Sequence, residues 1–178
     1  DGLGSVAAWK TVTVRPQVDG RLDKVRFREG QQVRRGEVLA EIDPRPFLAQ
    51  LHQAEGALAR DSAMLRNNRL NLERYTNLRK QDLIAQQQAD DQQAAVDQYA
   101  GAVNVDQAQI ENAKLQLGYA QITSPIDGVT GVRLIDEGNL VRASDPGGLV
   151  VVTQLDPIAV LFTLPEDDLP RLLPRQKQ

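Results

Sequence analysis

Residues 51–72 read LHQAEGALARDSAMLRNNRLNL, and every seventh position of this stretch is leucine. The series consists of Leu51, Leu58, Leu65 and Leu72. A second apolar series follows at the same spacing: Ala89, Val96, Val103, Ile110 and Leu117. Apolar residues at a spacing of seven line one side of an α-helix that packs against a partner helix. The break near Gln81–Gln86 is short, so the pattern predicts one long antiparallel α-helical hairpin over residues 44–118.

The expected ends of the two helices follow from their capping residues. Asp43 suits the N-cap position, and Pro44 suits the first helical position, where its missing N–H has no helical partner to lose. The first helix is expected to end near Lys80. The second is expected to span 86–117, with Gly118 as the C′ residue.

A second heptad row on the first helix is more polar than the leucine row. Its members are Phe47, Ala54, Asp61, Asn68 and Tyr75. One interpretation is a narrow seam in which Asp61 and Asn68 are partly solvated. The other is that these two polar side chains fix the register of the helices or the pairing with a neighbouring chain.

The segments on either side of the hairpin repeat one short pattern. Val18-Asp19-Gly20 returns as Ile126-Asp127-Gly128. Glu29-Gly30 returns as Glu137-Gly138. Both matches are separated by 108 positions, and a constant separation indicates an internal repeat. Each half is too short to bury a core alone, so we expect the halves to pair into one β-sandwich with the helices inserted between them.

Short β-branched runs and tight turns predict small strands in both halves. Between Leu22 and Phe27 the inward-facing positions change phase, which requires a β-bulge. An apolar strand over 156–163, followed by the capping-box pattern Thr163–Glu166, predicts the start of a further β-rich domain, and residues 4–8 are its expected strand partner. The expected fold class is therefore α+β, divided into residues 1–11, 12–43, 44–118, 119–154 and 155–178.

The composition excludes several classes of function. The chain of 178 residues has 4% aromatic and 41% hydrophobic residues, which is thin for a compact core and ordinary for an extended coiled coil. Its net charge of −3 gives no electrostatic basis for binding nucleic acid. It has no cysteine, and it has no run of about 18 apolar residues. Because the chain starts with Asp1 rather than methionine, we expect further segments beyond its ends.

No arrangement of residues typical of catalysis or cofactor binding is present. The sole histidine, His52, is beside Leu51 on the first helix without cysteine or paired carboxylates nearby, and it is expected to be a surface residue. The acidic groups Asp90-Asp91 and Glu166–Asp168 fall near expected helix starts, where the helix dipole favours them. There is no phosphate-binding loop, dinucleotide fingerprint or zinc-protease motif. We therefore expect no enzyme activity, no cofactor and no metal.

The split repeat interrupted by a helical hairpin resembles the biotinyl/lipoyl-like domain of periplasmic adaptor proteins, also called membrane fusion proteins. The run from Tyr119 to Gly128 is similar to the family's entry into its second half-motif. The run from Asp156 to Glu166 is similar to the entry into its β-barrel domain. The strongest resemblance is to the branch that serves RND multidrug pumps. It implies lipoyl-like half-motifs at 12–43 and 119–154, and part of a β-barrel formed by 1–11 and 155–178.

The resemblance implies an adaptor that links an inner-membrane RND drug/proton antiporter to a TolC-like outer-membrane channel. Such an adaptor lies in the periplasm, is anchored to the inner membrane through a segment outside this chain, and forms a ring, expected to be a hexamer. The family's tip motif, which contacts the channel, consists of arginine, leucine and serine. Arg74 and Leu78 match it, whereas Ala85 stands in place of the serine. Arg74, Leu78 and Ala85 are therefore the expected channel-binding residues.

Three alternative interpretations share part of this pattern, and the first of them stays within the class of adaptor proteins. An adaptor of an ABC-type exporter would have the same fold. A biotinyl or lipoyl carrier would need an exposed lysine between its half-motifs, but no lysine occurs between Lys24 and Lys80. A plain coiled-coil scaffold would leave the repeated β-motif unexplained.

Overall fold

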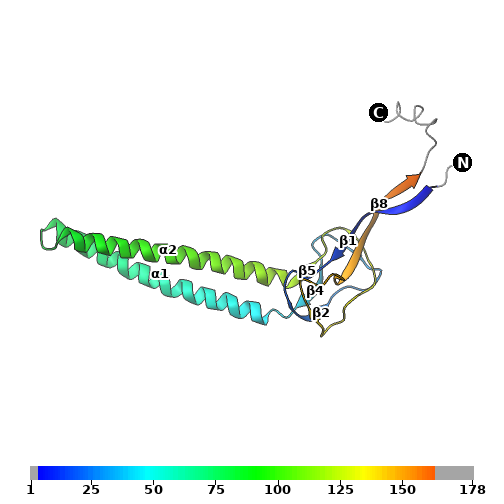
Figure 1. The fold of residues 1–178 in the computed structure, drawn as a ribbon, viewed down its shortest axis with the longest axis horizontal. Helices are drawn as coiled ribbons and strands as arrows, with labels where there is room; N and C mark the ends of the chain where they lie inside the picture. Colours follow the sequence, from blue (N-terminus) through cyan, green and yellow to red (C-terminus); the bar gives the residue numbers. More distant parts are fainter. Residues whose placement is uncertain (1–3, 163–178) are drawn as a thin grey trace, which may run out of the picture. The chain divides into compact units, whose positions relative to one another are not determined.

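The structure is a computed structural model that describes residues 4–162. Two compact units form within it (Figure 1). The described part of the first, the β-domain, consists of residues 4–42 and 121–162, and the second, the helical unit, consists of 43–120. Several expected features lie outside the described residues. They are the strand start at 1–3, the capping-box pattern Thr163–Glu166, the acidic group Glu166–Asp168 and the remainder of the expected barrel segment to residue 178.

The described part of the β-domain contains eight strands. Four precede the helices: β1 (Gly4–Val14), β2 (Gly20–Val25), β3 (Gln32–Val33) and β4 (Val38–Ile42). Four follow them: β5 (Gln121–Thr123), β6 (Gly128–Thr130), β7 (Leu140–Val141) and β8 (Val150–Phe162). They form two four-stranded antiparallel sheets, in the orders β1-β8-β6-β3 and β5-β4-β2-β7. Each sheet takes two strands from each side of the hairpin, so neither half forms a sheet alone.

The two sheets are built alike. β2 pairs with β7 at Gly20 and Val141, and β6 pairs with β3 at Gly128 and Val33. Each residue of the second pair lies 108 positions from its counterpart in the first. The sequence repeat is therefore a structural repeat in which strands are exchanged. The short strand of each half pairs with a longer strand of the other.

Two glutamates join the halves in a reciprocal way. Glu29 Oε1 accepts a hydrogen bond from Arg133 N at 2.9 Å. Glu137 Oε1 accepts one from Val25 N at 2.7 Å. Glu137 is the repeat counterpart of Glu29, and Arg133 is the repeat counterpart of Val25. The two hydrogen bonds are therefore equivalent under the repeat, with the roles of the two halves interchanged.

The repeated aspartates form a second reciprocal pair of hydrogen bonds between the halves. Asp19 Oδ1 accepts from Ala143 N at 2.7 Å, and Asp127 Oδ1 accepts from Arg35 N at 2.8 Å. A hydrogen bond to a charged acceptor is stronger than one between neutral groups. Each motif carboxylate therefore ties down a backbone donor of the opposite half. We refer to these four residues as the cross-half carboxylates: Asp19, Glu29, Asp127 and Glu137.

The glycines of the motif are required by the same geometry. At Gly20 and Gly128 an added Cβ would overlap atoms of the neighbouring strands β4 and β8. Gly30 and Gly138 have positive φ angles of 75° and 87°, a conformation that glycine adopts at little cost. The repeated Asp-Gly and Glu-Gly pairs thus combine a carboxylate contact with a backbone that only glycine fits well.

Both halves contribute to the core of the β-domain. Its large side chains with almost no exposure are Leu22, Val33, Leu39, Ile42, Val141, Leu149, Val150 and Val152. Leu22 and Phe27 are both buried, as the sequence predicts. The pairing of β2 with β4 shifts register between Leu22 and Lys24, which is the expected bulge.

The apolar strand predicted near 156–163 is the C-terminal part of β8, which runs without a break from Val150. Its expected partner is confirmed, because β1 pairs with it from Gly4 opposite Phe162 to Ala8 opposite Ile158. Pro157 does not end the strand because it lies where the register of the two strands shifts, and proline is tolerated at such an irregularity.

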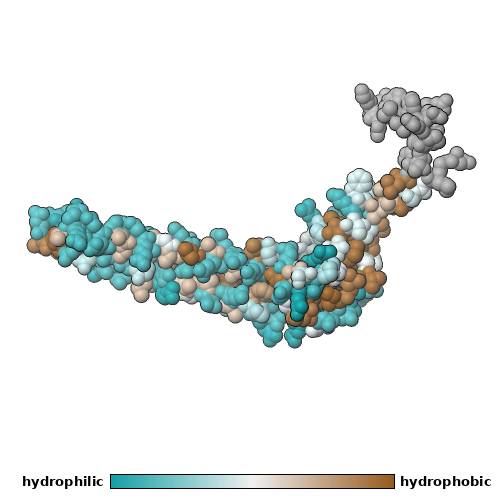
Figure 2. All heavy atoms as spheres, in the orientation of Figure 1, coloured by the Kyte–Doolittle hydropathy of each residue, from teal (hydrophilic) through white to brown (hydrophobic). Residues whose placement is uncertain are grey.

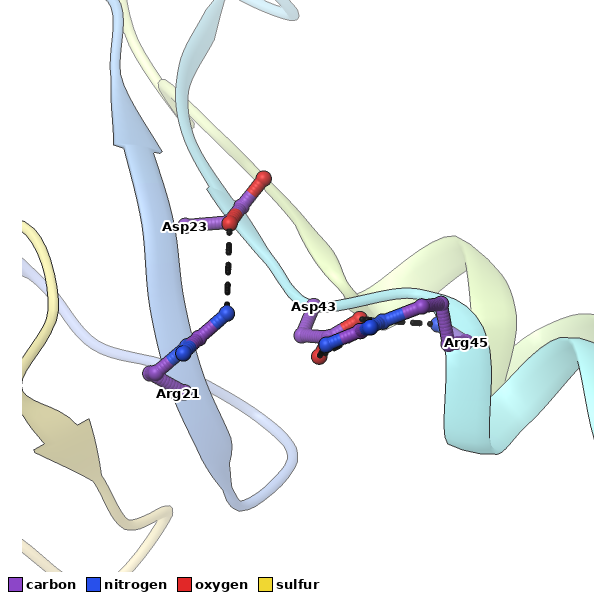
Figure 3. A network of polar contacts seen from close by, with 4 residues as sticks. All are labelled: Arg21, Asp23, Asp43 and Arg45. Carbon is purple, nitrogen blue, oxygen red and sulfur yellow. Dashed lines mark hydrogen bonds and ion pairs between the residues drawn. The ribbon is translucent and has the colours of Figure 1, made fainter.

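The helical unit consists of α1 (Arg45–Lys80) and α2 (Gln86–Tyr119), an antiparallel pair (Figure 1). Helix α1 begins one residue later than predicted, with Pro44 rather than Asp43 in the cap position. Asp43 still binds the first turn. Its Oδ1 accepts from Arg45 N at 3.1 Å, and its Oδ2 lies 2.6 Å from Arg45 Nη2 (Figure 3).

The predicted end of α2 is wrong in one respect. Gly118 lies inside the helix, which continues one residue past it, and is not a C′ residue. Ala120 has helical backbone angles, and its N–H bonds to the carbonyls of Gln116 and Leu117 at 3.2 Å each. A left-handed glycine is not needed because the chain enters β5 directly at Gln121.

The seam between α1 and α2 contains small and polar residues as well as the leucine row. Its buried members are Ala54, Leu65, Ala89, Val96, Asp106 and Ala113. Gln92 Nε2 donates to Asn68 Oδ1 at 2.9 Å and to Asn68 O at 3.1 Å, and this contact joins the helices. For Asn68 in the polar heptad row of α1, this contact favours the interpretation that the side chain fixes the register of the two helices.

Removal of one cross-half carboxylate is expected to destabilise the β-domain. Glu137→Ala and Glu29→Ala should each lower the free energy of unfolding by about 1 kcal/mol, because each removes one charge-assisted hydrogen bond at an exposed site. The two losses should be similar because the bonds are repeat counterparts. Urea unfolding of the purified chain, followed by fluorescence of Trp9 in β1, measures them.

The matched control is Asp23→Ala in β2. The Asp23 carboxylate makes an exposed ion pair with Arg21 at 3.8 Å (Figure 3), so its removal should change the free energy by less than about 0.5 kcal/mol. Equal losses in the control and in Glu137→Ala would contradict a special role for the cross-half carboxylates.

Candidate functional site

The connection between α1 and α2 is a tight reversal over Gln81–Ala85. Asp82 N donates to Arg79 O at 2.9 Å, and Leu83 N donates to Leu78 O at 3.1 Å. Asp82 has a φ angle of 55°, in the left-handed region that aspartate tolerates better than β-branched residues do. The tip of the hairpin is therefore a hydrogen-bonded turn with a defined backbone.

Polar side chains join the two helices just below this turn. Arg79 Nη1 donates to Gln86 Oε1, and Gln86 Nε2 donates to Asp90 Oδ1 at 3.0 Å. Arg79 and Lys80 also occupy the last turn of α1, where positive charge interacts favourably with the helix dipole. Arg79 thus stabilises the reversal itself.

Arg74 and Leu78 lie about one helical turn apart on α1, and both side chains are exposed. Arg74 Nη1 lies 3.4 Å from Asn71 Oδ1, a long contact that uses one of its five donors. Leu78 is 37% exposed. The structure therefore places a cation and an apolar side chain on one helix within two turns of the reversal.

Ala85 occupies the cap position of α2 on the other side of the reversal. Its backbone is extended, with φ −68° and ψ 148°, and no side-chain bond caps the helix there among the described residues. A serine hydroxyl at this position could accept an N–H of the first turn, whereas the alanine methyl group cannot. The departure from the family motif leaves a small, exposed apolar side chain at the tip.

Leu83 is a tip residue that the sequence analysis missed. It is 65% exposed at the apex, and its N–H is held by Leu78 O. Figure 2 shows a hydrophobic area at the far end of the hairpin, among hydrophilic residues. Leu83 and Ile84 are large apolar residues in a reversal that has no helix face for them to cover, and this signal in the sequence could have identified Leu83.

The groove between α1 and α2 is lined by side chains that are unsuited to catalysis. A groove of about 350 Å³ between the helices is lined by five side-chain amides and three alanines, which neither titrate nor act as nucleophiles. Over residues 4–162 no cluster of three or more histidine, cysteine or acidic residues could bind a metal. His52 is exposed on α1. Within the same range, no helix is both long and apolar enough to span a membrane.

A β-domain whose halves exchange strands, with a helical hairpin inserted between the halves in sequence, is the architecture expected from the resemblance to membrane fusion proteins. The family model described as "RND MFP, barrel-sandwich hybrid domain", where MFP stands for membrane fusion protein, matches residues 10–153. The chain belongs to the RND family of membrane fusion proteins.

Curated relatives named "Multidrug resistance protein MdtA" match almost the whole chain. The protein from Photorhabdus laumondii is 49% identical over 99% of this chain and 44% of its own length. The protein from Yersinia enterocolitica is 50% identical over 99% of this chain and 40% of its own length. The chain thus spans about two fifths of the length of these relatives.

A solved structure of a MacA-MexA chimeric protein, which contains the MexA α-hairpin domain of Pseudomonas aeruginosa, shares this fold. It is 31% identical, has a TM-score of 0.60, and matches 94% of this chain and 56% of its own length. The similarity includes a protein whose title names an α-hairpin domain, which agrees with the α1–α2 pair found here.

The left-handed residue at the tip provides a test of the reversal. Asp82→Gly should preserve the turn, because glycine adopts a φ of 55° without a steric penalty. Asp82→Val should loosen it, because a β-branched residue is strained in that region. Hydrogen exchange of Leu83 N–H, which is bonded to Leu78 O, should be at least as slow as wild type in the glycine variant and faster in the valine variant. Equal exchange in both variants would contradict the turn geometry.

Proposed function

We propose that the chain is the hairpin-bearing part of a periplasmic adaptor that links an inner-membrane RND drug/proton antiporter to a TolC-like outer-membrane channel. The single observation that carries the proposal is 49% identity to an MdtA multidrug resistance protein across 99% of the chain. Membership of the RND family favours this function over an adaptor for an ABC-type exporter and over a biotinyl or lipoyl carrier.

The mechanism is mechanical rather than chemical. The chain leaves the β-domain at Ile42 in β4 and returns at Gln121 in β5, and these two strands are neighbours, with Glu41 opposite Gln121. Both connections to the hairpin therefore start from one part of one sheet. The cross-half carboxylates hold together the two halves that supply these strands.

The tip is the proposed contact with the channel. Arg74 supplies a cation with several donors, which suits carboxylates and backbone carbonyls on a partner. Leu78 and Leu83 supply exposed apolar area that is removed from water on binding. At Ala85 the contact lacks the hydroxyl of the family motif, and we propose that this position selects a channel whose matching surface is apolar.

The proposed assembly is a ring of adaptors, with six subunits by analogy with the family, in which hairpins lie side by side. The adaptor is anchored to the inner membrane through a segment outside residues 1–178. The lipoyl-like half-motifs at 12–43 and 119–154, and the barrel segments at 1–11 and 155–178, remain part of this proposal. The many amide side chains on the helices suit lateral contacts because an amide both donates and accepts.

Reversal of charge at Arg74 tests the tip assignment. In the full-length protein, Arg74→Asp should weaken channel binding by about tenfold or more and abolish efflux, since an exposed arginine anchor is replaced by the opposite charge. Helical content by circular dichroism should be unchanged because the side chain is exposed. Co-purification with the channel and drug susceptibility of cells provide the two measurements.

Arg66→Asp is the matched control, because Arg66 is an exposed arginine on the same helix, about two turns further from the reversal. It should bind the channel like wild type. Wild-type efflux in cells that carry Arg74→Asp would contradict the proposed role of the tip.

Leu83→Asp is expected to weaken channel binding while preserving the hairpin, because it puts a charge on an apolar surface that the partner would cover. The comparison is Leu70→Asp, which changes a leucine of α1 that is 50% exposed and lies about three helical turns before the reversal. Channel affinity measured by surface plasmon resonance should fall only in the first variant. Equal affinities of the two variants would remove Leu83 from the site.

A further inference from the structure

The two helices of the hairpin carry opposite net charges. Helix α1 has seven arginine and lysine residues and three acids, whereas α2 has one lysine and five acids. The formal net charge is therefore +4 on α1 and −4 on α2. Helices that only needed charged residues for contact with water would not require one sign on each helix.

The contrast is strongest in the half of the hairpin nearest the reversal. Residues 66–80 of α1 contain five cations and one acid, and α2 has no lysine or arginine before Lys114. No single side chain decides the contrast, because α1 keeps a positive net charge when any one of its cations is reversed. The exposed cations of this half are Arg66, Arg69, Arg74, Arg79 and Lys80, and its exposed acids are Asp90, Asp91 and Asp97.

These charges are not paired with each other inside the hairpin. Among the described residues no ion pair joins α1 to α2. Asp90 and Asp97 accept hydrogen bonds from glutamine amides of their own helix, at 3.0 Å and 2.9 Å. Arg79 donates to the amide of Gln86. Because the partners are neutral amides, the opposite charges of the two helices remain for a contact outside the hairpin.

The outer side of each helix, away from the seam, is exposed. Asn67 and Ala94 each lie two positions from a buried residue of the seam, which is about 200° around the helix, and both are exposed. They also lie at nearly the same level along the hairpin, since the adjacent Asn68 is hydrogen-bonded to Gln92 across the seam. Two copies side by side at one height would therefore bring Asn67 of one copy opposite Ala94 of the other.

We propose that the hairpin binds a second copy of this chain side by side, with the positive α1 of one copy against the negative α2 of the next, and that this charge contrast fixes the order of the helices. The inference rests on the proposed ring of adaptors and specifies its lateral contact. Contact between two α1 helices, or between two α2 helices, would place like charges together. A partner of one charge sign would match only one helix, whereas a second copy matches both. Such a head-to-tail contact can close into a ring.

The first test removes the acids of α2 from the full-length protein. Asp90→Asn, Asp91→Asn and Asp97→Asn in one variant should weaken self-association by about tenfold, because three exposed attractions of modest size are lost together. Raising the salt concentration from about 0.1 M to about 1 M shortens the Debye length from about 10 Å to about 3 Å, so it should weaken the wild-type association and change that of the variant much less. Sedimentation velocity over a range of protein concentrations measures both effects, and circular dichroism checks that the helices are kept.

The matched control combines Asp23→Asn, Asp136→Asn and Asp156→Asn. These acids of the β-domain are also exposed, and their removal changes the net charge of the chain by the same amount. Association should keep its wild-type strength and its wild-type dependence on salt. An equal loss in this variant would show an effect of net charge alone and would overturn the assignment to α2.

Cross-linking in the full-length protein decides which helices meet. The chain has no cysteine, so an introduced thiol is single within residues 1–178. A short bismaleimide cross-linker should join a mixture of Asn67→Cys and Ala94→Cys into dimers, because neighbouring packed helices have axes about 8–10 Å apart. Each variant alone, and the wild type, should give no dimer.

The outcomes separate this inference from the proposed ring. Equal cross-linking of either variant alone and of the mixture overturns the order of the helices. Unchanged self-association after removal of the three α2 acids overturns the role of charge and leaves the ring in place. A wild-type protein that stays monomeric at every concentration overturns both.

Discussion

The hydrogen bond from a backbone N–H of one half to a carboxylate of the other is the interaction on which the β-domain depends. Because each sheet contains strands from both sides of the hairpin, a contact that joins the halves also fixes both sheets. Glu29 and Glu137 make this contact in mirrored fashion, as do Asp19 and Asp127. The arrangement of the two sheets is thus set by four acidic side chains and the glycines that follow them.

The hairpin follows a different principle, in which specificity is gained at some cost in stability. Alanine at Ala54 and Ala113 buries little apolar area, and polar contacts such as Gln92 to Asn68 occupy places where leucine would bury more. Polar layers of this kind fix the register of paired helices, because a shifted pairing would leave a buried polar group without its partner. For a long hairpin of this kind, a fixed register therefore matters more than a large core.

Much of this arrangement could be predicted from the sequence, and the exceptions have physical causes. The heptad series located α1 and α2, and the constant separation of 108 residues showed that the flanking segments are equivalent. Equivalence does not reveal which strands pair, so the exchange of β3 and β7 was not foreseen. Asp106 was missed because an acid between apolar positions is read as solvent-facing. Leu83 was not predicted because the family motif includes only the positions of Arg74, Leu78 and Ala85.

The exchange of strands between halves has a consequence for how the chain folds. Pairing β2 with β7 closes a loop of more than a hundred residues, which is slow when the intervening chain is a random coil. Helices form from contacts close in sequence, so α1 and α2 can pair first and bring Ile42 and Gln121 together. The hairpin then acts as a tether that turns a distant encounter into a local one, and its pairing is expected to precede assembly of the β-domain.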